Sequence, residues 1–396
     1  MQRENVAGRV RVSRLQEQRI AAGHLWVFAG EIETVEGKPT PGDLVDLTSG
    51  SGRYCGRGFF NAHSKIRVRI LTFQDEPIHD EFWRTRLLRA ASLRKRVVSN
   101  SNAYRLVHGE GDLLPGLIVD RYADVLVMQT LSVGMDRRKE LLADSLTRLT
   151  GVTAVYLRND TSSRRLEGLP TGRGFLRGKA ETRIGIAEGS ARFLVDIERG
   201  QKTGWFCDQR ENRMAAAALT EGAQVLEVFC HTGAFGIQAT LRGAASILGL
   251  DSSGEAITLA REHAHMNGVS LQCEYRQVDA FEELPKLERA GHRYDAVILD
   301  PPAFARSRAS VPRALAGYKE INLRALSLLR PEGFLITCSC SYHVSERGLW
   351  GAILEAAHDA KRQVRLLEVR SQASDHPMLA SMPETRYLKC FILQAL

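Results

Sequence analysis

The sequence has 396 residues, of which 44% are hydrophobic and 25% are charged. This balance is ordinary for a folded globular protein and excludes bulk disorder. The length predicts about two or three domains, of which we expect three. The seven cysteines are scattered and lack the paired CxxC spacing of a zinc site. We therefore expect free thiols, with neither a disulfide framework nor a bound metal.

The charge pattern bears on the location and partners of the chain. No apolar run approaches the roughly 18 to 20 residues that span a bilayer, and residues 1–14 do not resemble a signal peptide. We expect a cytoplasmic protein without membrane contact. The net charge of +8 favours a polyanionic partner, because each neutralised phosphate releases counterions. Nucleic acid is the leading candidate, and a basic but inert surface is the alternative.

Residues 1–74 predict a small, mostly β module. The segment 56–61 is expected to form a glycine-rich bend, and its two aromatic residues are interpreted as core packing rather than base stacking. Apolar or alternating runs between Gly and Pro turn signals predict strands at 9–12, 25–28, 44–47 and 66–71.

Residues 75–185 predict a compact α+β region. A helix is expected over 82–98, where six basic residues from Arg84 to Arg96 include no acid between them, so one face is a candidate phosphate contact. A solvated face is the alternative. The Arg-rich segment 158–183 is expected to be a surface loop. Further predicted elements are a hairpin over 117–129, a helix over 137–149 and a strand at 154–157.

From about residue 186 onward, strands alternate with helices, which predicts a parallel sheet with crossover helices. In an open α/β sheet the carboxyl ends of the strands converge on the ligand crevice. Apolar runs that end in polar residues predict strands at 225–230, 246–251, 271–279 and 294–300.

An ordered series of acids follows these strands. Glu227, Asp251 and Asp279 stand at successive strand ends, and Gly233 opens the first helix. Glycine permits close approach of the backbone to a ligand, and an acid after the second strand is placed to bind ribose hydroxyls. The glycine spacing departs from GxGxxG, so a small adenosine ligand without phosphates fits better than a dinucleotide.

These motifs resemble those of class I S-adenosylmethionine-dependent methyltransferases, on the evidence of 227–235, Asp251, Asp279 and 300–304. More narrowly, the chain is similar over essentially its whole length to the ribosomal RNA large-subunit methyltransferase I family. The segments that carry this narrower resemblance are 200–213, Ser339-Cys340-Ser341, 372–377 and 387–389.

The resemblance implies an α/β protein with three domains: an RNA-binding PUA domain at 1–74, a central α+β domain at 75–185 that contacts RNA, and a Rossmann-like methyltransferase domain at 186–396. It implies 5-methylcytosine formation in large-subunit ribosomal RNA or its precursor particle, with S-adenosylmethionine as cofactor. We also expect that the PUA module can contribute to a homodimer.

The resemblance also implies roles for single residues. Asp251 would hold the cofactor's ribose and Asp279 its adenine amino group, while a helix cap or a surface acid is the alternative for either. Lys202 would meet the cofactor or the target nucleotide. The implied cofactor-binding residues are Gln209, Arg210, Glu227, Gly233, Phe235, Asp251 and Asp279, and the implied substrate-binding residues are Lys202, Pro301, Phe304 and Arg306.

Methylation at carbon 5 of cytosine requires covalent activation, because that carbon is a poor nucleophile until a thiolate adds to carbon 6. Cys338 and Cys340 face the same way in a continuing strand, so periodicity cannot choose between them. Cys340 is nearer the carboxyl end and occupies the family's Ser-Cys-Ser position. We expect Cys340 to be the nucleophile, Cys338 to be a packed residue, and Asp300 to stabilise the adduct through the base edge.

The proton acceptor stays open, because the Asp-Pro-Pro-Ala-Phe motif lacks the second cysteine of better-known RNA cytosine methyltransferases. Asp300, another side chain or water are the candidates. His343 and His376, with Asp375 beside them, lie close to this region, and a histidine could serve as the base, but a structural or surface histidine is the favoured interpretation. The segment 304–319, with its three arginines, is expected to be a mobile loop that faces RNA.

Two other functions stay open. A methyltransferase that modifies a base nitrogen of guanine or adenine would need no covalent thiol. An RNA-binding assembly factor with a vestigial cofactor site is the alternative from another class, although the complete carboxylate series argues against it.

Overall fold

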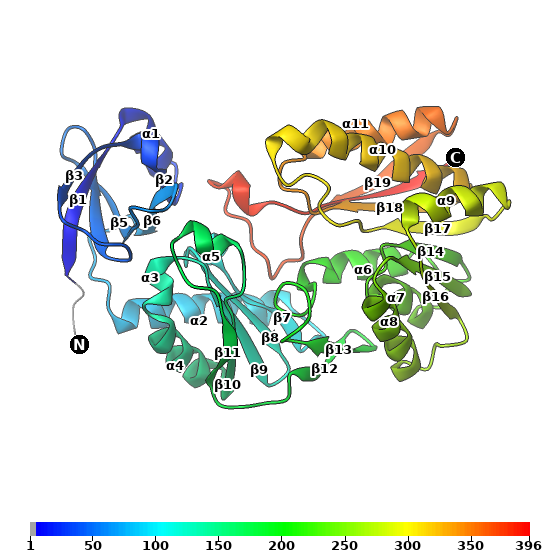
Figure 1. Cartoon of the computed structure of the whole chain (residues 1–396), viewed down its shortest axis with the longest axis horizontal. Coiled ribbons are helices and arrows are strands. Elements are labelled where there is room, and N and C mark those ends of the chain that lie inside the picture. The colour runs from blue at the N-terminus through cyan, green and yellow to red at the C-terminus, as the bar shows by residue number, and fades with distance from the viewer. Residues whose placement is uncertain (1–4) are drawn as a thin grey trace. The chain divides into compact units, whose positions relative to one another are not determined.

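The computed structural model describes residues 5–396 (Figure 1). They form two compact units. The first comprises the described residues up to Ile186 with Val195–Cys207 and Ser374–Thr385, and the second comprises Ala187–Leu194, Asp208–Ala373 and Arg386–Leu396. Between residues 5 and 396, no helix has the length and apolar character needed to cross a membrane. The three predicted domain ranges stay a prediction.

A six-stranded sheet in the order β2-β6-β5-β4-β1-β3 opens the first unit. The segment 56–61 is largely strand, not the expected bend, because glycine lets two backbones approach: a Cβ on Gly58 would lie 2.2 Å from the carbonyl oxygen of Arg69. Phe59 and Phe60 are buried, which confirms the packing interpretation. The elements are β1 (Val6–Val12), α1 (Arg14–Ala21), β2 (Trp26–Phe28), β3 (Ile32–Gly37), β4 (Leu44–Thr48), β5 (Tyr54–Phe60) and β6 (Ile66–Thr72).

A five-stranded sheet in the order β11-β10-β9-β8-β7 follows in the same unit. The predicted hairpin is confirmed as the antiparallel pair β8–β9, and the predicted helices and strand are also present. The elements are α2 (Asp80–Val97), β7 (Ala103–His108), β8 (Leu117–Tyr122), β9 (Val125–Thr130), α3 (Val133–Asp136), α4 (Lys139–Thr150), β10 (Ala154–Arg158), α5 (Ser163–Leu166) and β11 (Arg173–Arg177).

The expectation of a surface loop over 158–183 was correct in part, because most of the segment is exposed or half-buried. The segment contains α5 and β11, and two of its arginines are buried. Arg164 Nη1 lies 2.9 Å from Asp136 Oδ1, and Arg158 Nη1 donates to the Ile197 carbonyl at 2.8 Å. Guanidinium groups with several fixed acceptors tolerate burial, so these two arginines hold the fold together instead of facing a polyanion.

The basic run of α2 is divided between the interior and the surface. Arg94 is 1% exposed and donates to Asp112 Oδ1 at 2.5 Å and to the Asp375 carbonyl at 2.7 Å. His376 is also buried, with Nδ1 3.0 Å from Asp375 Oδ1, which supports its structural interpretation. The exposed basic residues of the run are Arg84, Arg89, Lys95 and Arg96.

A two-stranded sheet of β12 (Arg183–Glu188) and β13 (Ala191–Asp196) precedes the larger sheet of the second unit. That sheet has seven strands in the order β16-β15-β14-β17-β18-β20-β19; β14 to β18 are parallel, and β20 is antiparallel to both neighbours. The strands are β14 (Gln224–Val228), β15 (Ser246–Asp251), β16 (Cys273–Gln277), β17 (Tyr294–Leu299), β18 (Leu329–Ser339), β19 (Val364–Arg370) and β20 (Lys389–Ala395).

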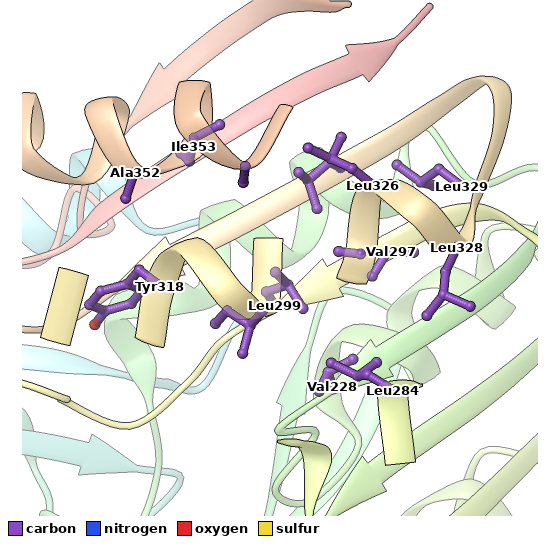
Figure 2. Close-up of a cluster of buried hydrophobic side chains, with 14 of the residues drawn as sticks. Val228, Leu284, Val297, Leu299, Tyr318, Leu326, Leu328, Leu329, Ala352 and Ile353 are labelled. Atoms are coloured by element: carbon purple, nitrogen blue, oxygen red, sulfur yellow. The ribbon is translucent and has the colours of Figure 1, made fainter. Parts of the chain in front are cut away.

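Helices cover both faces of this sheet. Successive strand residues alternate between the two cores: Val228 and Leu299 belong to the core with α9, α10 and α11, while Ile298 and Ile336 belong to the core with α6 and α7. Figure 2 shows part of the first core. The predicted α/β class is confirmed. The helices are α6 (Arg210–Ala217), α7 (Ala234–Leu241), α8 (Gly254–Met266), α9 (Ala280–Arg289), α10 (Val311–Leu328) and α11 (Glu346–Asp359).

The loop expected over 304–319 is shorter than predicted. Helix α10 begins at Val311 and buries Ala314 and Tyr318, so Arg313 lies in a helix. Pro312 in the first turn favours this start, because its missing N–H and fixed φ cost nothing there.

Candidate active site

The carboxyl ends of the parallel strands meet at one edge of the seven-stranded sheet. Val228 of β14 pairs in register with Leu250 of β15 and Leu299 of β17, and Leu299 pairs with Thr337 of β18. The sheet therefore brings together polar residues that are far apart in sequence. Those at this edge are Glu227, Gly233, Asp251, Asp279, Asp300 and Cys340.

The loop after β14 has a contorted backbone. Phe229 and His231 have φ angles of 61° and 48°, and Gly233, the N-cap of α7, has a φ of 74°. A left-handed φ is unfavourable for residues with a Cβ, so this loop holds stored strain, as ligand-binding loops often do. At Gly233 a side chain is also excluded sterically, because a Cβ would lie 2.4 Å from the Tyr275 hydroxyl.

Glu227 fastens this loop to the strand. Its Oε1 accepts from the N–H of Phe235 at 3.2 Å and its Oε2 accepts from the N–H of Gly236 at 3.0 Å. Amides in the first turn of a helix have no acceptor within the helix, and here the carboxyl group of Glu227 supplies it. Burial raises the pKa of Glu227 to about 8, against the lowering effect of the two amides. The carboxyl is therefore largely protonated at neutral pH.

The side chain of Phe235 packs into the core beside Ala239 and Ile247. Its part in the loop comes from its backbone N–H. Arg210 begins α6, is buried, and lies 3.6 Å from Glu211 through Nη2 and Oε1.

Two acids lie at the ends of the next strands. The half-buried Asp251 accepts from the N–H of His231 at 2.8 Å and from the N–H of Ser253 at 2.9 Å. Asp279 is exposed and caps α9, with Oδ1 accepting from the N–H of Phe281 at 2.7 Å. A carboxylate offers about four acceptor positions, so both groups retain capacity for a ligand.

Asp300 follows β17 and is held by a buried amide. Gln209 Nε2 donates to Asp300 Oδ1 at 2.9 Å, and Gln209 Oε1 accepts from Asn212 Nδ2 at 2.7 Å. Asn212 Oδ1 in turn accepts from Arg370 Nε at 3.1 Å. Asn212 and Arg370 were missed by the sequence reasoning, because contacts among α6, β17 and the end of β19 depend on the fold.

The two neighbouring cysteines have different surroundings. Cys338 lies inside β18, paired with Cys390 of β20, and is fully buried. A hydrogen bond with Cys390 and burial raise the pKa of Cys338 well above its ordinary value. Cys340 follows the strand end, is half-buried, and has Sγ 3.9 Å from the Pro301 carbonyl oxygen. Cys338 is therefore a packing residue, whereas Cys340 lies beside the Asp300-Pro301 loop.

The serines on either side of Cys340 share one partner. Ser339 Oγ donates to the Tyr318 hydroxyl at 2.8 Å, and the Ser341 hydroxyl lies 3.0 Å from it. Ser341 Oγ also accepts from the N–H of Ala305 at 3.3 Å. The turn that carries Cys340 is thus tied to α10 and to the loop after Asp300. The Ser-Cys-Ser motif indicated this turn in the sequence, but no sequence pattern indicated the contact with Tyr318.

Three of the four predicted substrate residues lie on the loop after β17, and the fourth, Lys202, does not. Pro301 is buried, and Phe304 is half-buried with its ring 4.7 Å from that of Tyr318 and 6.0 Å from that of Phe281. Arg306 is exposed on the same loop. Lys202 belongs to the other compact unit, where its ammonium group lies 4.5 Å from the centre of the Phe206 ring.

The comparisons with known proteins agree with this geometry. A family model of S-adenosylmethionine-dependent methyltransferases matches residues 105–374, and one of PUA-like domains matches residues 10–73. Ribosomal RNA large subunit methyltransferase I of Aeromonas hydrophila is 39% identical over 96% of this chain and 97% of its own length. The chain belongs to the ribosomal RNA large subunit methyltransferase I family.

Other family members and solved structures are similar over the whole chain. The protein of the same name from Shewanella amazonensis is 40% identical over 96% of this chain and 98% of its own length. A candidate methyltransferase complexed with SAH superposes with a TM-score of 0.85 at 20% identity, over 98% of this chain and 99% of its own. This methyltransferase therefore uses S-adenosylmethionine and has the predicted PUA-like and Rossmann-like folds.

Proposed function

We propose that the protein transfers a methyl group from S-adenosylmethionine to carbon 5 of a cytosine in large-subunit ribosomal RNA, through a covalent adduct between Cys340 and carbon 6. The observation that carries this proposal is the half-buried thiol of Cys340 at the carboxyl edge of the sheet, 3.9 Å from the carbonyl oxygen of the residue after Asp300. The substrate follows the names of the relatives.

The donor groups at the sheet edge fit this cofactor. In the proposal, Asp251 binds the ribose hydroxyls, Asp279 binds the adenine amino group, and the loop from Glu227 through Gly233 to Phe235 lies against the cofactor. Gln209 and Arg210 lie at the start of α6 and complete this set. When bound, S-adenosylmethionine supplies an electrophilic methyl group.

Cys340 and Asp300 divide the remaining chemistry. The Cys340 thiolate adds to carbon 6, which places electron density on carbon 5. Asp300, oriented by Gln209, accepts a hydrogen bond from the cytosine amino group or from protonated N3 and so favours the adduct. After methylation, loss of the carbon 5 proton lets the thiolate leave. The proton acceptor is Asp300, another side chain or water.

Access to Cys340 requires that the target base leave its stack. In the proposal Pro301 and Phe304 form the wall against which the base lies, and Arg306 and Lys202 contact phosphates. The exposed basic residues of α2 and the PUA-like domain add RNA contacts. A ribosomal precursor particle is an alternative substrate to free RNA. A homodimer and a cytoplasmic location stay predictions, and light scattering on the purified chain measures the first.

The test uses large-subunit ribosomal RNA that lacks the modification. We expect label from methyl-labelled S-adenosylmethionine to appear in 5-methylcytosine after digestion, and expect Cys340→Ala to abolish it while Cys338→Ala retains it. Label on guanine or adenine, or near-normal turnover by Cys340→Ala, would indicate chemistry at a base nitrogen. No heat on titration with S-adenosylmethionine would instead support an RNA-binding protein with a vestigial site.

A further inference from the structure

A buried lysine lies next to the turn that carries Cys340. Lys389 is the first residue of β20, pairs in register with Ser339, and is 5% exposed. Its Nζ donates to the Ser341 carbonyl oxygen at 2.7 Å. An ammonium group is costly to bury unless a negative charge or several acceptors compensate it. A single carbonyl compensates only part of this cost, so the role of Lys389 depends on the acidic groups near its ammonium group.

Three ionisable groups act on Lys389 besides its own burial. Burial lowers the pKa of Lys389 to about 8, the Cys340 thiol and Glu346 oppose that shift, and Arg386 adds to it. Glu346 of α11 is already paired with Arg386 in a salt bridge. Lys389 lies opposite Ser339 and donates to the carbonyl of Ser341, so its ammonium group lies beside the turn whose middle residue is Cys340.

Other groups near Cys340 disfavour a thiolate or stay neutral. Asp300 precedes Pro301 on the neighbouring loop, and its carboxylate would repel a thiolate. Tyr318 of α10 lies near enough for the thiol to act on it, but burial raises the pKa of that hydroxyl, and it stays neutral. The Pro301 carbonyl oxygen, 3.9 Å from Sγ, presents a partial negative charge that would disfavour a thiolate. A positive charge nearby is what the thiolate needs.

We propose that the ammonium group of Lys389 stabilises the thiolate form of Cys340. The inference rests on the proposed function, in which that thiolate adds to carbon 6. On ionisation the S–H bond of Cys340 breaks, its proton passes to solvent, and Lys389 keeps its own proton. Lys389 is thus a positioning residue that acts through Cys340. The attraction is mutual, so the effect is present while Lys389 is charged and fades as the pH rises through about 8.

The test measures the ionisation of Cys340 directly, without RNA or cofactor. The rate of alkylation by iodoacetamide is followed from pH 6 to 10, and mass spectrometry assigns the modified cysteine. In the unaltered protein we expect the midpoint for Cys340 to lie below about 8.5, the ordinary value for a free cysteine. A midpoint at or above that value overturns the proposal, whatever the variants do.

Three substitutions separate charge from structure. Lys389→Met removes both the charge and the donor, Lys389→Gln keeps a donor for the Ser341 carbonyl without the charge, and Lys389→Arg keeps the charge. We expect Met and Gln to raise the midpoint by about one pH unit and to slow alkylation at pH 7 about tenfold, and Arg to restore most of the loss. Lys286→Met, an exposed lysine on α9, is the control and should change nothing.

Each result has one interpretation. If Lys389→Gln keeps the original midpoint, Lys389 only fixes the turn and the proposal is wrong. Thermal melting identifies any variant that does not fold. Alkylation needs neither RNA nor turnover, so a negative result overturns the role of Lys389 and leaves the proposed cytosine chemistry intact. Full activity of Cys340→Ala would overturn the proposed cytosine chemistry, and it would not change the midpoint measured for Cys340 in the unaltered protein.

Discussion

The side-chain amide of Gln209 connects α6 to Asp300, with Nε2 donating to Oδ1 at 2.9 Å. Because Asn212 donates to the other end of the amide, the orientation of Gln209 is fixed with its N–H toward the carboxylate. Gln209 and Asn212 are 3% and 1% exposed, so water does not easily replace either bond. This geometry indicates that Gln209 orients the Asp300 carboxylate, whereas the sequence predicted a contact between Gln209 and the cofactor.

Replacing Gln209 should therefore affect turnover more than cofactor binding. A hydrogen bond to a charged group is worth about 1.5 to 3 kcal/mol, so Gln209→Leu should lower kcat roughly 10- to 100-fold. The dissociation constant for S-adenosylmethionine should change by less than about threefold, on the same scale. Single-turnover methylation and calorimetry measure the two quantities. Gln363→Leu, at an exposed site, is the control, and equal losses of binding and turnover in Gln209→Leu would contradict this role.

The two cysteines should respond differently to serine. Cys338→Ser places a hydroxyl in the core beside Ile336 and Ile392, which should lower the free energy of unfolding by about 1 to 3 kcal/mol. Cys340→Ser lies at a half-buried strand end and should change it by less than about 0.5 kcal/mol. Urea unfolding measures both. A larger loss of stability for Cys340→Ser than for Cys338→Ser would reverse the assignment of packing and site residue.

Glu227 should make stability depend on pH. Its pKa is raised from 4.5 in the unfolded chain to about 8 in the fold, so the folded protein holds a proton that the unfolded chain releases between these values. The contribution of Glu227 to stability is therefore greatest below pH 4.5 and is lost as the pH rises through 8.

The neutral variant Glu227→Gln lacks this titration. Between pH 6 and pH 8.5 the unaltered protein should lose more unfolding free energy than Glu227→Gln does, by a few kcal/mol. Chemical unfolding at both pH values gives the difference, in which the contributions of all other groups cancel. Parallel pH profiles for the two proteins would mean that Glu227 is ionised in the fold.

Gly233 should tolerate alanine less well than a glycine of similar conformation. Gly233 and Gly268 have φ angles of 74° and 70°, so Gly→Ala costs each about 1 kcal/mol of backbone strain. At Gly268 nothing lies within 4 Å of the new Cβ, whereas at Gly233 the Tyr275 hydroxyl would lie 2.4 Å away.

Gly233→Ala should therefore lower the melting temperature further than Gly268→Ala, and it should also weaken S-adenosylmethionine binding. Cζ and Cε1 of Tyr275 would also lie 2.7 and 2.9 Å away, so only removal of the ring relieves the contact, and Gly233→Ala should cost less in a Tyr275→Ala background than in the unaltered protein. Thermal unfolding and calorimetry test each step. Equal effects of the two alanine variants would show that the loop moves aside and that the close contact has no consequence.

The sequence by itself determined the class of the fold and the order of the site residues. Strand patterns in 225–300 carry Glu227, Asp251 and Asp300 at or near their carboxyl ends, and parallel strands place such ends at one edge whatever the details of packing. These features depend on periodicity and on neighbours in the chain.

The tertiary structure decided what depends on distant partners. A period of two left Cys338 and Cys340 equivalent, and they differ because β20 covers Cys338 while the strand ends before Cys340. The sequence pattern predicted Arg94 on a basic face. It is buried instead, because its guanidinium group donates to Asp112 and to the Asp375 carbonyl. Lys389 reaches the Ser341 carbonyl because the antiparallel pairing of β18 and β20 sets Lys389 opposite Ser339, two residues before Ser341. Burial and charge pairing are properties of the folded sheet, so no local pattern could have shown them.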